Sequence, residues 1–167
     1  MKAISYIFVF LGATSLFSQQ TLEEVLAKYN DDSIPYISSE TLANLEDNTA
    51  TIVLDTREKK EYEVSHIRGA IHVGYKTFDI NTVSENIKNK DTPIVVYCSL
   101  GIRSEDIGET LEKAGYTMVK NLYGGIFRWK NKDFPVVNTQ QKETDSVHVY
   151  SKKWGKWLTK GIKVSNK

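Results

Sequence analysis

Short runs of Val, Ile and Leu alternate with polar segments of helical spacing, and this alternation limits the possible folds more than any other feature. Four of the runs are short, apolar and rich in β-branched side chains, which predicts buried strands at residues 51–55, 70–73, 93–98 and 118–122. Helices are expected at residues 21–29, 41–45, 83–88 and 104–114. The pattern predicts an α/β domain with a mostly parallel sheet, helices on both faces and ligands at the carboxyl ends of the strands.

The best-defined helix is expected at residues 104–114. Ile107 and Leu111 lie one turn apart and would form its apolar face. Ser104 is expected to be the N-cap residue, and Gly115 is expected to end the helix.

The first residues resemble a secretory signal. Lys2 precedes an apolar run, and no further charge occurs before Glu23. The run is too short to span a bilayer comfortably, which needs about 20 residues. We expect residues 1–18 to be a cleaved signal peptide and the protein to be exported, to the periplasm or the extracellular space. An uncleaved membrane anchor is the alternative.

Charge and cysteine content exclude several classes of protein. The 167 residues carry 22 basic and 21 acidic side chains, a balance that argues against a nucleic-acid partner. One Cys cannot form a disulfide within the chain, and with three His it gives little basis for a metal site. The Gly-rich fingerprints of dinucleotide and nucleoside triphosphate sites do not occur, so no cofactor is expected.

Cys98 is the candidate catalytic residue. It follows the most apolar predicted strand and opens a short loop that leads directly into the helix at 104–114. Backbone N–H groups at such a junction lack helical partners and point at any anion in the loop, so they should lower the pKa of the thiol. The residues expected to surround the sulfur and bind substrate are Ser99, Leu100, Gly101, Ile102, Arg103 and Ser104. The alternative is that Cys98 is a small buried residue that ends a strand.

Four segments in order resemble the motifs of the rhodanese (sulfurtransferase) family. Residues 98–104 resemble its C-x-x-G-x-R-S active-site loop. The other three are residues 54–57 with 61–62, residues 66–71, and residues 123–125 with Trp129.

The resemblance implies a single α/β domain at residues 34–137 with a mostly parallel five-stranded sheet. Residues 19–33 would be an N-terminal helical extension and residues 138–167 a basic C-terminal extension. It also implies that Cys98 carries a persulfide and passes sulfane sulfur from a donor such as thiosulfate to a thiol or cyanide acceptor. Ser99 and Leu100 are uncharged, whereas members specialised for thiosulfate often have basic residues in this loop.

Three further residues are predicted to support the site. Asp55 and Arg57 end a neighbouring strand, where they would either rim the pocket or form an ion pair that shapes the loops, and we favour the ion pair. His66 would be either a general base for Cys98 or a residue that orders a loop, and we favour the second role.

Two other functions remain open. Cysteine phosphatases use C-x5-R, but here Arg103 follows Cys98 at C-x4-R spacing, which suits a single sulfur better than a phosphate. A non-catalytic binding module is the alternative from another class. Retention of Cys98 argues against it.

The C-terminal extension is basic, with seven Lys against Glu143 and Asp145 in residues 139–167. Its mixture of Lys with Trp154 and Trp157 suits weak contact with a membrane surface or an anionic partner. We favour a second interpretation, in which both Trp side chains pack on the domain while the lysines face water.

Overall fold

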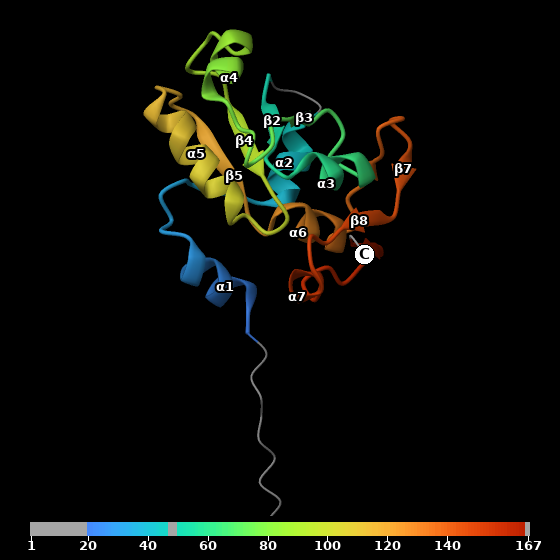
Figure 1. Ribbon diagram of the computed structural model, residues 1–167. Coiled ribbons are helices and arrows are strands. Elements are labelled where there is room, and N and C mark those ends of the chain that lie inside the picture. Colours follow the sequence, from blue (N-terminus) through green and yellow to red (C-terminus); the bar gives the residue numbers. More distant parts are fainter. Residues whose placement is uncertain (1–19, 47–49, 166–167) are drawn as a thin grey trace, which may run out of the picture.

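The computed structural model describes residues 20–46 and 50–165, so the predicted signal peptide lies outside the described residues. Figure 1 shows the arrangement of the elements. The helices are α1 (Leu22–Tyr29), α2 (Ser39–Glu46), α3 (Lys59–Val64), α4 (Ile80–Asn86), α5 (Arg103–Lys113), α6 (Gly125–Asn131) and α7 (Lys152–Gly155). The strands are β1 (Tyr36–Ile37), β2 (Ile52–Asp55), β3 (Ile71–His72), β4 (Ile94–Tyr97), β5 (Val119–Leu122), β6 (Val136–Val137), β7 (Glu143–Thr144), β8 (Ser146–His148) and β9 (Ile162–Val164).

Five strands form one parallel sheet in the order β1-β5-β4-β2-β3. Each predicted strand is present, so the expected α/β fold with a five-stranded parallel sheet is confirmed. In the register between β2 and β4, Asp55 lies opposite Tyr97. The carboxyl ends of these two strands are therefore level, and the loop that begins at Cys98 leaves the sheet beside Asp55.

The sheet separates two apolar clusters, because alternate side chains of a strand point to opposite faces. Val95 and Tyr97 of β4 face a cluster that includes Leu42 of α2 and Phe127 of α6. Ile94 and Val96 face the other cluster, which includes residues of α4 and α5. Figure 1 shows α4 and α5 on one side of the sheet and α2 and α6 on the other. Both faces are covered, as the apolar strand sequences predicted.

The start of α5 differs from the prediction. The helix begins at Arg103, and Ser104 lies inside its first turn instead of serving as the N-cap residue. The Ser104 hydroxyl is buried and donates to Asn121 Oδ1 on β5 at 2.8 Å. Gly115 follows the helix with a φ of +94°, in agreement with its expected role as the terminating residue.

The C-terminal residues fold against the domain. Residues 138–141, at the predicted boundary of the basic extension, form the turn between β6 and β7, and β8 pairs in parallel with β9. Val147, Val149 and Leu158 are buried in the cluster that also contains Val95 and Tyr97. Trp154 and Trp157 pack against this cluster, as the second interpretation of the extension predicted for these two side chains. Within the described residues, no helix combines the length and apolarity needed to cross a membrane.

Candidate active site

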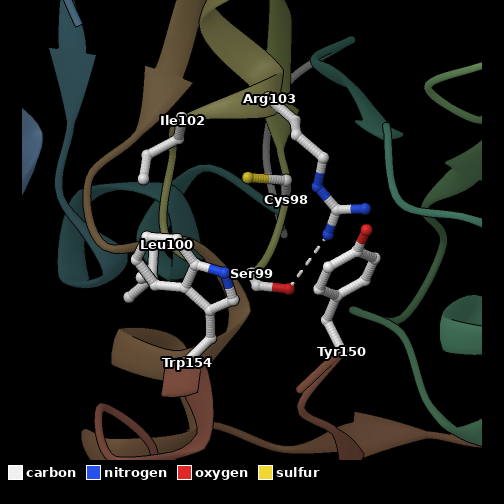
Figure 2. A pocket seen from close by; sticks show the side chains of 7 residues that line it. All are labelled: Cys98, Ser99, Leu100, Ile102, Arg103, Tyr150 and Trp154. Carbon is white, nitrogen blue, oxygen red and sulfur yellow. Dashed lines mark hydrogen bonds between the residues drawn. The ribbon is translucent and has the colours of Figure 1, made fainter. Parts of the chain in front are cut away.

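Cys98 lies directly after β4, at the carboxyl end of the sheet. Its side chain is buried at 2% exposure, yet its sulfur lines a cavity (Figure 2). The Gly101 N–H donates to the Cys98 Sγ at 3.2 Å. The backbone N–H groups of Leu100 and Ser104 also act on this sulfur, because they lower the pKa of the thiol. The loop therefore holds the sulfur among inward-pointing amides, the geometry expected from the strand–loop–helix sequence.

The backbone of Gly101 is fixed in a conformation that favours glycine. Its φ is +106°, and its carbonyl accepts bonds from Asn30 Nδ2 at 2.9 Å and from Asn121 Nδ2 at 2.8 Å. Two side-chain amides thus hold the carbonyl on the outside of the loop. This leaves the Gly101 N–H directed at Cys98.

The first turn of α6 supports the other end of the loop. The Ile126 N–H donates to the Cys98 carbonyl at 3.0 Å, and the Phe127 N–H donates to the Ser99 carbonyl at 3.2 Å. This approach requires glycine at position 125. Gly125 has a φ of +53°, and a Cβ there would lie 2.3 Å from the Cys98 carbonyl oxygen.

Arg103 is held by a buried carboxylate. Its guanidinium makes a bidentate pair with Glu61 on α3, at 2.8 and 2.9 Å. The Ser99 hydroxyl completes this cluster, because it accepts from Arg103 Nη2 and donates to Glu61, both at 3.2 Å. The Arg103 guanidinium also lies over the Tyr150 ring, 5.1 Å from its centroid. Arg103 therefore orders the loop and places a fixed positive charge near the sulfur.

The pKa of the Cys98 thiol depends on opposing effects. Burial alone would raise this pKa, because the thiolate loses hydration. The positive charge of Arg103 and the N–H groups of Leu100, Ser104 and Gly101 outweigh burial. The pKa of Cys98 is consequently lower than that of an ordinary thiol, which favours the nucleophilic thiolate.

The cavity at Cys98 has a volume of about 230 Å³. Its walls combine the loop with two rings from the C-terminal residues, and its lining residues are Cys98, Ser99, Leu100, Ile102, Arg103, Tyr150 and Trp154. Figure 2 shows the Tyr150 and Trp154 rings rising from the C-terminal segment toward the loop. Of the six loop residues predicted to bind substrate, four line this pocket, whereas Gly101 and Ser104 do not.

Asp55 and Arg57 form a buried ion pair. Both side chains have 0% exposure, and Arg57 Nη2 lies 2.6 Å from Asp55 Oδ2. Arg57 also donates to the Ser65 carbonyl at 2.6 Å, and the Tyr97 hydroxyl donates to Asp55 at 2.6 Å. The pair thereby ties the ends of β2 and β4 to the loop after α3. The geometry agrees with the loop-shaping role.

His66 is engaged away from the sulfur. Its ring stacks on Tyr62 with centroids 3.9 Å apart, and Nδ1 lies 3.1 Å from the Tyr62 carbonyl oxygen. Its backbone forms a bridge with Val137, with both N···O distances at 2.9 Å. Burial lowers the pKa of this imidazole, which favours its neutral form. These contacts join the loop after α3 to β6, in agreement with an ordering role.

Several residues of the site were not assigned a role from the sequence. Glu61 lies in one of the four motif segments. The sequence showed an acidic residue there and gave no further indication that it pairs with Arg103. Nothing in the sequence indicated that Asn30 and Asn121 bind the Gly101 carbonyl, because an isolated Asn belongs to no recognisable motif. Tyr150 and Trp154 lie far from Cys98 in sequence, so only the folded chain brings them to the pocket.

The fold and the site together define a class of protein: a parallel α/β domain that presents a cysteine in a loop of amides between a strand and a helix. Residues 38–132 match the family model described as Rhodanese-like domain. The chain belongs to the rhodanese-like domain family, as the four motifs predicted.

Two curated relatives are similar to parts of this chain. The chain is 36% identical over 100 residues to the tRNA uridine(34) hydroxylase of Photorhabdus laumondii, covering 58% of this chain and 28% of that protein. It is 34% identical over 104 residues to the putative sulfur carrier protein YrkF of Bacillus subtilis, covering 62% of this chain and 55% of that protein. Each match spans less than two thirds of the relative, so the activity of the whole relative does not follow for this chain.

Solved structures agree with the fold. The Rhodanese-like domain of an Anabaena protein has a TM-score of 0.56 and 25% identity, covering 62% of this chain and 79% of that chain. The thiosulfate sulfurtransferase of Pseudomonas aeruginosa has a TM-score of 0.60 over 82% of this chain and 25% of that chain. At 24% identity, the second likeness concerns the fold alone.

Proposed function

We propose that this protein is a sulfurtransferase in which Cys98 carries the transferred sulfur as a persulfide. The observation that carries the proposal is the position of the Cys98 sulfur, which lines a small pocket and accepts an N–H bond from Gly101 at 3.2 Å. The charge of Arg103 and the loop amides lower the pKa of the thiol, which favours the ionised form of the attacking group. No separate general base is needed for the attack.

The reaction has two steps. In the first, the Cys98 thiolate attacks the outer sulfur of a donor such as thiosulfate. The sulfur–sulfur bond of the donor breaks, sulfite leaves with the bonding electron pair, and Cys98 becomes a persulfide anion. In the second step, a thiolate or cyanide attacks the terminal sulfur and releases the Cys98 thiolate. Both sulfur species on the enzyme are anions, so the same loop amides stabilise each of them.

The test is the intact mass of the protein after treatment with thiosulfate, polysulfide or a thiosulfonate. We expect a gain of one sulfur atom that disappears when cyanide is added. Cys98→Ser, which keeps the size of the side chain, should show no gain. If no donor adds sulfur to the wild-type protein, the domain acts as a binding module and the proposal is wrong.

We also propose that the protein is exported, on the basis of the apolar run that follows Lys2. Cell fractionation should recover the protein outside the cytoplasm, with a new N-terminus near Gln19. Recovery of the full-length chain in the cytoplasm would contradict export. That result would leave the proposed reaction unchanged.

A further inference from the structure

One wall of the Cys98 pocket lies outside the residues that define the family. The family model matches residues 38–132, whereas Tyr150 and Trp154 follow this region. Both rings line the cavity together with Cys98 (Figure 2). The C-terminal segment of this chain therefore supplies part of the wall of the pocket that contains Cys98.

This wall is anchored on the domain. Val149 is 3% exposed and Leu158 is 0% exposed, and they bracket the segment that carries the two rings. The Trp154 ring also makes an edge-to-face contact with Tyr29 of α1, with centroids 5.9 Å apart. Trp154 is thus held between the body of the domain and α1. The ring therefore packs on the apolar core and on α1 while it lines the pocket.

The described residues that line the pocket offer a doubly charged anion no unpaired cation. Among its lining residues, all within the described part of the chain, Arg103 is the one basic side chain. Both of its terminal nitrogens are bonded to Glu61, and its guanidinium lies over the Tyr150 ring. A dianion that enters would lose hydration without gaining an unpaired cation. The remaining lining is mainly apolar, with Leu100, Ile102 and the two rings.

We propose that Tyr150 and Trp154 make this pocket selective for sulfur donors whose leaving group carries an apolar or aromatic substituent. The proposal rests on the proposed sulfurtransferase function and names the class of donor. Organic thiosulfonate anions, in which a hydrocarbon group replaces one oxygen of thiosulfate, belong to this class. The Cys98 thiolate attacks their terminal sulfur, the sulfur–sulfur bond breaks, and an organic sulfinate leaves with the electron pair. The Cys98 thiolate and the thiosulfonate each carry one negative charge before the step. The persulfide and the sulfinate each carry one after it.

Three donors form a matched series for the test. Benzenethiosulfonate and methanethiosulfonate have the same charge and differ in apolar surface, while thiosulfate carries one more negative charge. Intact mass follows the rate of persulfide formation with each donor. Each rate is then divided by the rate at which the same donor reacts with a small free thiol. We expect kcat/KM for benzenethiosulfonate to be about tenfold above that for methanethiosulfonate, because a phenyl group buries more apolar surface than a methyl group. Thiosulfate should have the lowest value.

Trp154→Ala tests the role of the ring. We expect the benzene-to-methane ratio to fall to about twofold, because the rate with benzenethiosulfonate falls much more than the rate with methanethiosulfonate. Trp154→Phe should restore most of the ratio. Trp157→Ala is the matched control, because Trp157 lies on the same segment and does not line this cavity. Tyr150→Ala provides a second test, since its half-exposed ring can be removed with less risk to folding.

The outcomes separate this inference from the proposed function. If no donor yields a persulfide, the proposed function is wrong. If persulfide forms but thiosulfate reacts fastest, the inference on donor class is overturned while the function stands. An unchanged benzene-to-methane ratio in folded Trp154→Ala and Tyr150→Ala would likewise exclude a role for the C-terminal rings.

Discussion

The nucleophilicity of Cys98 depends on whether its thiol is ionised near neutral pH. Burial disfavours the thiolate, but a buried anion also interacts more strongly with nearby charges and dipoles than an exposed one does. Arg103 and three loop N–H groups surround the sulfur, and their combined effect lowers its pKa. The chain has one cysteine, so a thiol reagent reports on this residue alone.

We predict that alkylation of Cys98 by iodoacetamide will reach half of its maximal rate at a lower pH than alkylation of a small free thiol under the same conditions. Arg103→Gln removes the positive charge, so it should move this midpoint to higher pH and slow the reaction at pH 7. The rate at each pH is measured by intact mass. Arg68→Gln is the control, because Arg68 is exposed and pairs with Glu143 instead of Glu61. Equal midpoints in the two variants would contradict this account.

The ion pair of Asp55 and Arg57 leads to a prediction about stability. Asp55→Asn leaves the Arg57 charge buried without a carboxylate, which should cost about 3–5 kcal/mol in the free energy of unfolding. Glu63→Gln removes an exposed partner of Lys59 and should cost less than about 0.5 kcal/mol. Urea denaturation measures both values. A loss below about 1 kcal/mol for Asp55→Asn would show that the pair is dispensable for stability.

At the scale of elements, the conformation of the Cys98 loop is set by its neighbours. The first turn of α6 binds the carbonyls of Cys98 and Ser99, and β5 supplies Asn121 to the Gly101 carbonyl. Each contact fixes a carbonyl on the outside of the loop and leaves the N–H groups inside. The arrangement around the sulfur is therefore a consequence of how β5 and α6 pack, and it should be sensitive to changes outside the loop.

Gly125→Ala tests this dependence. The new Cβ would lie 2.3 Å from the Cys98 carbonyl oxygen, so α6 and the loop must separate. We predict a loss of stability and slower alkylation of Cys98 than in the wild-type protein. Gly69→Ala is the matched control: its φ is also positive, at +76°, but no atom lies within 4 Å of the added Cβ. It should cost about 1–2 kcal/mol and leave the alkylation rate unchanged. Equal alkylation rates in both variants would show that the contact does not shape the loop.

The sequence predicted the strands and helices whose apolar pattern is local and extends over enough residues to be recognised. The apolar runs at β2, β4 and β5 and the amphipathic pattern of α5 identified the sheet and the helix that follows Cys98. β1 has two residues, and α3 and α6 have six and seven, which is too short for a clear period. Ser104 was wrongly predicted to be the N-cap residue of α5. Its buried partner, Asn121, lies on β5, so no local pattern revealed the contact. Contacts between distant segments, such as Glu61 with Arg103, are set by packing and leave no local pattern.

At the scale of the whole molecule, the C-terminal residues share the core of the parallel sheet. Leu158 and Val147 are both 0% exposed and belong to the same cluster as Val95 and Trp129. Burial of apolar surface is cooperative when one cluster includes both parts of a chain. The segment that carries Tyr150 and Trp154 should therefore unfold together with the sheet.

Leu158→Ala tests this cooperativity. Removing the buried side chain leaves a cavity in the shared core, and we predict a loss of about 2–5 kcal/mol in the free energy of unfolding. Far-UV circular dichroism reports on the whole fold, while Trp fluorescence includes Trp154 and Trp157, so both signals should change at the same urea concentration. Ile162→Ala, at a 61% exposed position, should change stability by less than about 0.5 kcal/mol. A fluorescence transition that precedes the dichroism transition in Leu158→Ala would mean that the C-terminal segment detaches first, and the aromatic wall of the Cys98 pocket would then be an independent unit.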